Sequence, residues 1–139
     1  VYMKKDLPEN IVADVSIAVV LENETPTEKH WNVYLINEKK LPLSNVLVSS
    51  KGYGLKNNVQ VKTSVLRHFL GDVPAEGIVQ IEAIAPEVLG LTNEYWLSYY
   101  IDKTIYDKKY IFLPESIVEE HLIKVPLVNK PGIVIGGTK

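Results

Sequence analysis

Hydrophobic and polar positions alternate with a period of two in several separate stretches of this chain. The clearest stretch spans residues 31–37, where Trp31 and Val33 fall on one face, and a second follows at 42–50 after a polar turn at 37–40. Successive side chains of a β-strand point to opposite sides, so this alternation predicts strands with one buried face. The two stretches therefore predict a pair of adjacent strands.

The same pattern recurs along the rest of the chain, with turns rich in glycine, asparagine and proline between the runs. Residues 51–58 and 71–77 predict two of these turns. Strand and helix patterns do not alternate, so we predict an all-β fold, an immunoglobulin- or fibronectin-like antiparallel β-sandwich of about seven to eight strands. The other expected strands are 11–21, 59–65, 78–84, the hairpin arms 93–101 and 104–113, and a short end at 133–135.

Alternation also predicts which side chains point inward. Val15 and Val19 alternate with polar or small residues, which predicts that the first strand is half-buried. In residues 78–84, Glu82 is expected to share a face with Ile78, Gln80 and Ile84.

Residues 116–123 do not fit a strand, because their hydrophobic positions define no single face. Ser116 followed by Glu119 matches the capping-box pattern at the start of helices. We therefore expect one short helix in this segment.

The 139-residue chain has the size of a single domain, and its 46% hydrophobic content is that of a folded protein. We expect a polar N-terminal segment at 1–10, one β-sandwich domain at 11–135 and a flexible tail at 136–139. Met3 reads as the native start, with Val1 and Tyr2 as an added remnant.

Cysteine is absent and no apolar stretch follows Met3, which together predict a cytoplasmic protein without disulfides or a signal peptide. No stretch is apolar enough to predict a membrane span. The net charge is −2, and Arg67 is the only arginine among fifteen basic residues. Nucleic-acid readers favour clustered arginine, so no nucleic-acid partner is expected.

Candidate chemistry is sparse. His68 lies close to serines, but no Gly-x-Ser-x-Gly motif presents a nucleophile. His121 follows two glutamates, yet no second histidine stands at the spacing of a zinc helix. We therefore predict no catalytic residue, no metal and no cofactor, while a hydrolase whose carboxylates or His68 converge only in the fold stays an alternative.

Aromatic residues are concentrated between positions 95 and 110. Side chains on both faces of a hairpin arm divide into core and exposed sets, and exposed aromatic rings anchor protein partners or sugar rings. Carbohydrate binding through the 95–110 hairpin is therefore an alternative to protein binding. The candidate interaction surface comprises Tyr53, Arg67, His68, Tyr95, Trp96, Tyr100 and Tyr106.

The run Trp31-x-Val33-x-Leu35-x-Asn37, with the later Val46-x-Val48-Ser49-Ser50, resembles the paired strands of immunoglobulin- and fibronectin-like accessory domains of bacteria. Residues 63–72, 93–96 and 105–116 are similar to a small uncharacterised bacterial family, and this likeness covers nearly the whole chain. Some of its members carry a phenylalanyl-tRNA synthetase subunit label. The residues here do not support that activity, because such a catalytic domain is a larger α/β fold whose motif arginines would map only onto Arg67.

Strands without a reactive motif favour a non-enzymatic module that binds an unidentified protein or itself. The apolar residues 133–135 predict either an edge strand or a strand that adds to a partner's sheet, and a strand-mediated dimer is the testable prediction.

Overall fold

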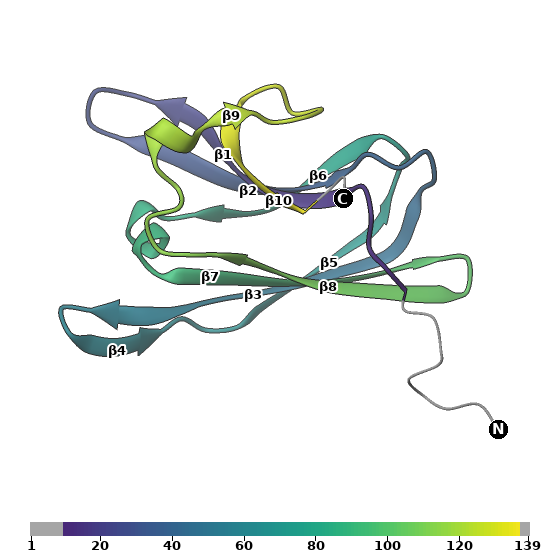
Figure 1. Cartoon of the computed structure of the whole chain (residues 1–139), viewed down its shortest axis with the longest axis horizontal. Coiled ribbons are helices and arrows are strands. Elements are labelled where there is room, and N and C mark those ends of the chain that lie inside the picture. The colour runs from purple at the N-terminus through teal and green to yellow at the C-terminus, as the bar shows by residue number, and fades with distance from the viewer. Residues whose placement is uncertain (1–9, 137–139) are drawn as a thin grey trace.

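Two antiparallel β-sheets packed face to face make up the structure, a computed structural model that describes residues 10–136 (Figure 1). The predicted all-β sandwich is confirmed. The strand count of seven to eight is wrong, because each sheet has five strands and residues 10–136 contain ten in total.

The first sheet has the strand order β6-β2-β1-β10-β9. It pairs strands that are distant in sequence, since β1 lies between β2 and β10. Its strands are β1 (Val15–Glu24), β2 (Lys29–Asn37), β6 (Gly77–Ile84), β9 (Ile123–Lys124) and β10 (Pro131–Gly136).

The second sheet has the order β4-β3-β7-β8, and β5 pairs with the same edge of β3 as β4 does, one after the other along its length. In the described part of the chain, two short 3₁₀ helices, η2 (Pro86–Gly90) and η3 (Glu119–His121), lie in connections. The strands are β3 (Leu43–Lys56), β4 (Val59–Lys62), β5 (Leu66–Val73), β7 (Thr92–Ile101) and β8 (Thr104–Phe112).

The two additional strands are β5, which begins in residues assigned to no strand, and β9, which starts at the last residue of the segment predicted as a helix. Residues 51–56 continue β3, and only Asn57 and Asn58 form the turn, with φ of 53° and 63°. Two consecutive left-handed residues make the tight hairpin turn that asparagine favours. The run predicted at 59–65 ends at Lys62, and β5 extends through part of the connection predicted at 71–77.

The first strand is buried on both faces, so its predicted half-burial is wrong. Val15 and Val19 pack between the sheets, as their alternation indicates. Ala18 and Val20 face the other way, where Val125 from the β9–β10 segment covers them. This long-range cover cannot be inferred from the local pattern.

The core between the sheets contains three tyrosines from the aromatic hairpin. The Tyr110 hydroxyl donates to the Val15 carbonyl at 2.7 Å, and the Tyr99 ring stacks on Tyr106 at 5.3 Å between centroids. Tyr95 packs edge to face against Phe112. Most of the tyrosines therefore serve packing.

The segment 116–123 contains only the single turn η3, and Ser116 does not cap it. The Ser116 hydroxyl instead donates to the Leu113 carbonyl at 2.6 Å. Gly136, predicted to begin the tail, pairs with Ser16 as part of β10. The remaining tail residues 137–139 and the polar segment 1–9, including the proposed start at Met3, lie outside the described residues.

Helices long and apolar enough to cross a membrane are absent from the described part of the chain.

Candidate functional site

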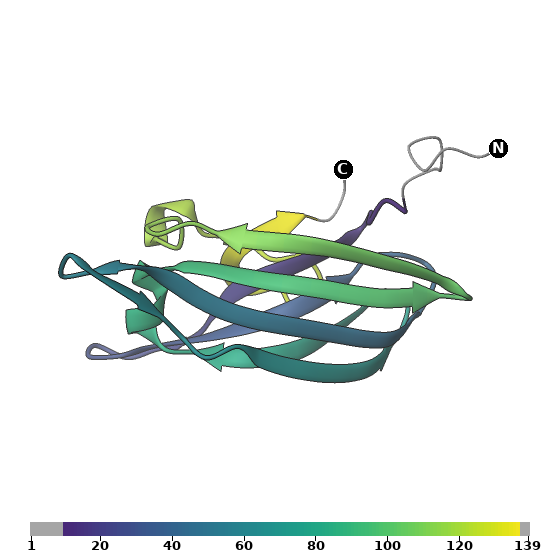
Figure 2. The same cartoon turned by 90° about the horizontal axis from the view of Figure 1, so that it is seen from below.

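Exposed aromatic and aliphatic side chains gather on the outer face of the second sheet. We use "outer face" for the side formed by β5, β3, β7 and β8 that points away from the first sheet, the side toward the viewer in Figure 2. Val48 and Leu97 point into the core, so the neighbouring Leu47 and Trp96 point outward. Trp96 is 46% exposed, which is high for a tryptophan in a central strand.

A cross-strand row places Trp96 between two cations. The register aligns Arg67 with Ser49, Ser49 with Trp96, and Trp96 with Lys109. The Lys109 ammonium lies 5.0 Å from the centre of the Trp96 ring. With neighbouring strands about 4.8 Å apart, Arg67 lies about 10 Å from Trp96 on the other side.

The adjacent row supplies most of the apolar surface. It aligns Phe69 with Leu47, then Ser98 and Asp107. Phe69 is 69% exposed. Tyr100, two residues after Ser98 in β7, is 36% exposed. Exposed apolar side chains grouped on one face of a sheet are a candidate interaction site.

Two acidic residues of the outer face differ in their surroundings: Glu94 is neutralised locally, whereas Asp107 forms no ion pair within residues 10–136. Glu94 accepts a hydrogen bond from the Tyr53 hydroxyl at 3.1 Å and lies 3.7 Å from the Lys51 ammonium. Burial, followed by this bond to Glu94, raises the pKa of the Tyr53 phenol above its ordinary value. Within residues 10–136, neither Arg67 nor Lys109 forms an ion pair with a carboxylate.

A shallow groove of about 260 Å³ runs beside the Trp96 ring. Its walls include Ser49, Val65 and Lys109. The groove therefore offers an aromatic surface with hydroxyl and ammonium donors around it.

The seven residues predicted as an interaction surface divide between two sides of the sheet. Tyr53, Arg67, Trp96 and Tyr100 lie on the outer face. Tyr95, Tyr106 and His68 point inward, where Tyr95 is buried and the other two are half-buried. His68 lies near the start of β5, a strand separate from β4.

Phe69, Leu47 and Lys109 were missing from the predicted surface. Phe69 stands two positions after Arg67, the period that places both on one face of a strand. That signal was available, but the strand was predicted to end before it.

A second constellation lies between the sheets around Glu82. Its Oε1 receives hydrogen bonds from the Ser50 hydroxyl at 2.9 Å and from His68 Nε2 at 2.7 Å. Its Oε2 accepts from the Tyr95 hydroxyl at 2.9 Å. Burial first, and then the charge of Glu82, raise the pKa of Tyr95 far above its ordinary value.

A β-bulge directs Glu82 inward, whereas simple alternation predicted one face for 78, 80, 82 and 84. Val33 pairs with Glu82 and the next residue, Tyr34, pairs with Gln80, so Ile81 is the extra residue. Beyond the bulge Glu82 and Ile84 share the inner face, while Gln80 lies on the other side and contacts Asn32. The shared-face prediction is therefore wrong.

The Glu82 cluster lacks the order of a nucleophilic relay. In such a relay the imidazole lies between the serine hydroxyl and the acid, and it takes the proton from serine. Here the carboxylate lies between Ser50 and His68, and both groups contact the same oxygen. The arrangement joins β3, β5 and β7 to β6, and it does not activate Ser50 through His68.

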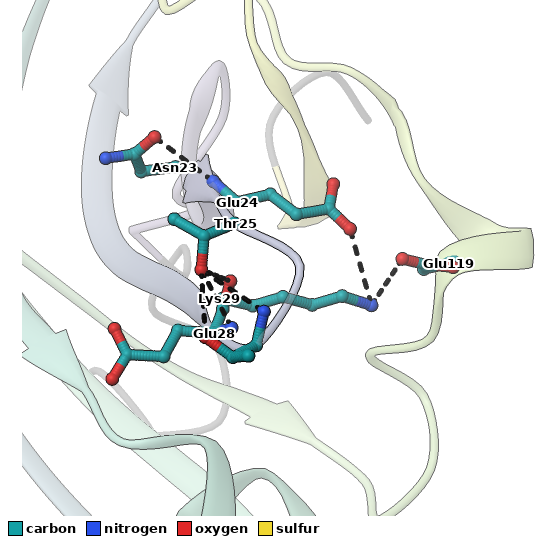
Figure 3. Close-up of polar contacts among 7 residues, drawn as sticks. Asn23, Glu24, Thr25, Glu28, Lys29 and Glu119 are labelled. Carbon is teal, nitrogen blue, oxygen red and sulfur yellow. Dashed lines mark hydrogen bonds and ion pairs between the residues drawn. The ribbon is translucent and has the colours of Figure 1, made fainter.

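A surface hollow of about 570 Å³ lies at the β1–β2 turn. Thr25 closes this turn by accepting from the Glu28 amide at 3.0 Å, and Lys29 extends between Glu24 and Glu119 (Figure 3). The hydrogen bond to Glu119 raises the pKa of Lys29 above its ordinary value. These charged groups bind one another, so the contacts serve to fix η3 against the hairpin.

The edge of β10 is open beyond Gly132, since within the described chain β9 pairs only with Pro131 and Gly132. The Lys130 carbonyl accepts from the Val125 amide on the β9 side. Peptide groups of a strand alternate in direction, so the Val134 N–H and C=O face the open edge. An apolar cleft of about 380 Å³ lined by Ile111, Leu113, Ile123 and Ile135 lies beside it.

The fold and these surfaces define an antiparallel β-sandwich with one exposed aromatic face. Comparison with models of known families, with curated proteins and with solved structures finds no match to this chain.

Proposed function

We propose that this protein is a non-enzymatic β-sandwich module that binds another protein through the outer face of the second sheet. The observation that carries the proposal is the exposed apolar surface of Phe69, Leu47, Trp96 and Tyr100 on a rigid sheet. Aromatic anchors at the centre of a patch commonly dominate the binding energy of protein interfaces. An immunoglobulin-like relationship and a cytoplasmic location belong to the same proposal.

The charges around the patch specify the partner's chemistry. Arg67 and Lys109 flank Trp96 and have no carboxylate partner within residues 10–136, whereas Glu94 is held by Lys51 and Tyr53. A complementary segment therefore presents an aromatic or aliphatic side chain with acidic residues nearby. Lys109 already covers the Trp96 ring, which favours a protein segment with a carboxylate over a sugar stacked on that ring.

A selection from a random peptide library displayed on phage tests this proposal. We expect enriched sequences that combine an aromatic or aliphatic residue with Asp or Glu, and we expect Trp96→Ala to weaken the selected peptides at least about tenfold, the loss of one interface anchor. Lys109→Glu should weaken them further through charge repulsion. Binding is measured by isothermal titration calorimetry.

Ile78→Ala is the matched control, since Ile78 is an exposed aliphatic residue on the first sheet. It should leave the affinity unchanged. Peptides without acidic residues, or peptides that bind Trp96→Ala as well as the unchanged protein, would contradict the proposal. If the selection enriches no peptide and the protein binds strongly to a glycan array, the carbohydrate alternative would be favoured.

Self-association through β10 is a second candidate, favoured by the outward-facing peptide group of Val134 and the apolar cleft beside it. A second copy's β10 can pair antiparallel along this edge and extend the first sheet. Proline at position 134 removes an N–H that faces the open edge, whereas proline at 133 removes one that faces β1.

We therefore expect Val134→Pro to abolish a dimer in analytical ultracentrifugation and to retain the folded circular dichroism spectrum. Ile133→Pro is the contrasting variant, and it should lower the free energy of unfolding, because it removes a hydrogen bond of the ladder between β1 and β10. Equal loss of structure in both variants would show that Val134 does not face an open edge. A monomer at every concentration before mutation would remove this candidate.

A further inference from the structure

A cleft of about 230 Å³ opens between the two sheets above the Glu82 carboxylate. The end of β6 and η2 form one wall, and the connection from β4 to β5 forms the other. The lining includes Ser64, Leu66, Ala85, Val88 and Tyr95. Most of the cleft surface is apolar, and the Glu82 carboxylate forms part of its lining.

Glu82 is only 14% exposed in its side chain, and within residues 10–136 its ion-pair partner is a histidine, His68 at 2.7 Å, with no Lys or Arg beside it. Buried carboxylates are ordinarily paired with a cation or fully hydrogen-bonded. The side chain has two oxygens with about four acceptor positions. Ser50 and His68 occupy two positions on Oε1, and Tyr95 occupies one on Oε2. One acceptor position on Oε2 remains.

We propose that this cleft binds an alkylammonium group, with the ammonium on Glu82 Oε2 and the alkyl chain against Leu66 and Val88. An ammonium donates three hydrogen bonds and neutralises the carboxylate, while a methylene chain suits the apolar walls. The cleft is smaller than a typical drug-sized pocket, which limits the ligand to a single flexible chain. Both a free aliphatic amine and a lysine side chain of another protein carry this chemistry.

The cleft is distinct from the outer face. Lys51 contributes to its rim, but the Lys51 ammonium extends toward Glu94 and the Tyr53 ring on the outer side of the sheet. The inference therefore does not depend on the proposed function.

The probes are n-butylamine and N-acetyl-lysine-N′-methylamide, titrated against the ¹⁵N-labelled full chain by NMR at neutral pH. We expect both to shift the amides of Ser64, Leu66 and Ala85. Tighter binding of the blocked lysine assigns the cleft to a protein partner, and tighter binding of butylamine assigns it to a free amine. n-Butanol, which keeps the chain and loses the charge, should bind at least tenfold more weakly.

Glu82→Gln should reduce the butylamine affinity at least tenfold. Glu94→Gln is the matched control, because Glu94 is 13% exposed in its side chain and lies outside the cleft; it should have no effect. Ala85→Leu tests the site with Glu82 intact, since Ala85 has an extended backbone that accepts leucine and its larger side chain fills the entrance.

Four results would overturn the inference. They are equal binding of n-butanol, equal losses in the Glu82 and Glu94 variants, unchanged amine binding in Ala85→Leu, and the absence of any shift with either amine.

Discussion

Replacing Gly132 with alanine should lower the free energy of unfolding by about 3 kcal/mol, at the upper end of the usual range for an overpacked site. A β-carbon at this position would lie 2.6 Å from the Val19 carbonyl oxygen and 2.7 Å from Val125 Cγ2. The carbonyl belongs to β1, which is fixed by pairing on both sides, so the clash cannot be relieved by turning a side chain. β10 must instead move away from β1.

Urea denaturation of the unchanged protein and of the Gly132→Ala variant, followed by circular dichroism, measures this loss of stability. Gly90→Ala is the control, because nothing lies within 4 Å of a β-carbon built on Gly90. The control should change stability by less than about 1 kcal/mol. A Gly132→Ala protein as stable as the Gly90→Ala protein would show that β10 does not approach β1 as closely as described.

The free energy of unfolding should fall steeply between pH 10 and pH 12. Burial raises the pKa of Tyr99 from its ordinary 10.0 to about 12, with a further contribution from Tyr106. Burial likewise raises the pKa of Tyr95 and Tyr110 well above the ordinary range. The unfolded chain releases these protons near pH 10, whereas the folded chain retains them.

A tyrosine whose pKa is raised on folding leaves the free energy of unfolding independent of pH below its unfolded pKa, and this free energy falls as the pH rises from the unfolded pKa to the folded pKa. Each of the three should remove about 1.4 kcal/mol of stability per pH unit above pH 10. Urea denaturation at several pH values between 8 and 12 gives the slope. Tyr99→Phe should reduce it by about a third, whereas Tyr100→Phe, on an exposed ring, should leave it unchanged.

Tyr99→Phe should also raise stability at neutral pH by up to about 1 kcal/mol, because among the described residues its buried hydroxyl has no hydrogen-bond partner. Tyr110→Phe should have the opposite effect, since it removes the bond to the Val15 carbonyl. A flat stability profile up to pH 12 would contradict the burial of all three hydroxyls.

The sequence predicts those parts of the fold that depend on local alternation. Val33 and Leu35 pack in the core, as their period-two spacing indicates. The double burial of β1 depends on Val125, more than a hundred residues away, and no local pattern contains that information. The glycines at 52 and 54 favoured a turn prediction. Gly52 instead lies in β3, where the close approach of Asn93 and Thr63 favours a residue without a side chain.

The candidate site was predictable to a similar extent. Trp96 and Tyr100 stand four positions apart, so a strand places them on one face, and the structure has both exposed. Which of the two faces is exposed follows only from the packing of Tyr95 against the opposite sheet. Glu82 depends on the bulge at Ile81, and a one-residue bulge leaves no mark in a hydrophobic pattern.

The pairing of β1 with β10 has a consequence for biosynthesis. Ser16 aligns with Gly136, so the third and fourth strands across the first sheet come from opposite ends of the described chain. On the ribosome, β1 and β2 emerge early, but one edge of β1 has no neighbour until residues 131–136 have been synthesised. An unpaired apolar strand is prone to pair with other chains, and such long-range contacts form slowly. The nascent protein should therefore depend on chaperone protection of β1 until translation reaches β10.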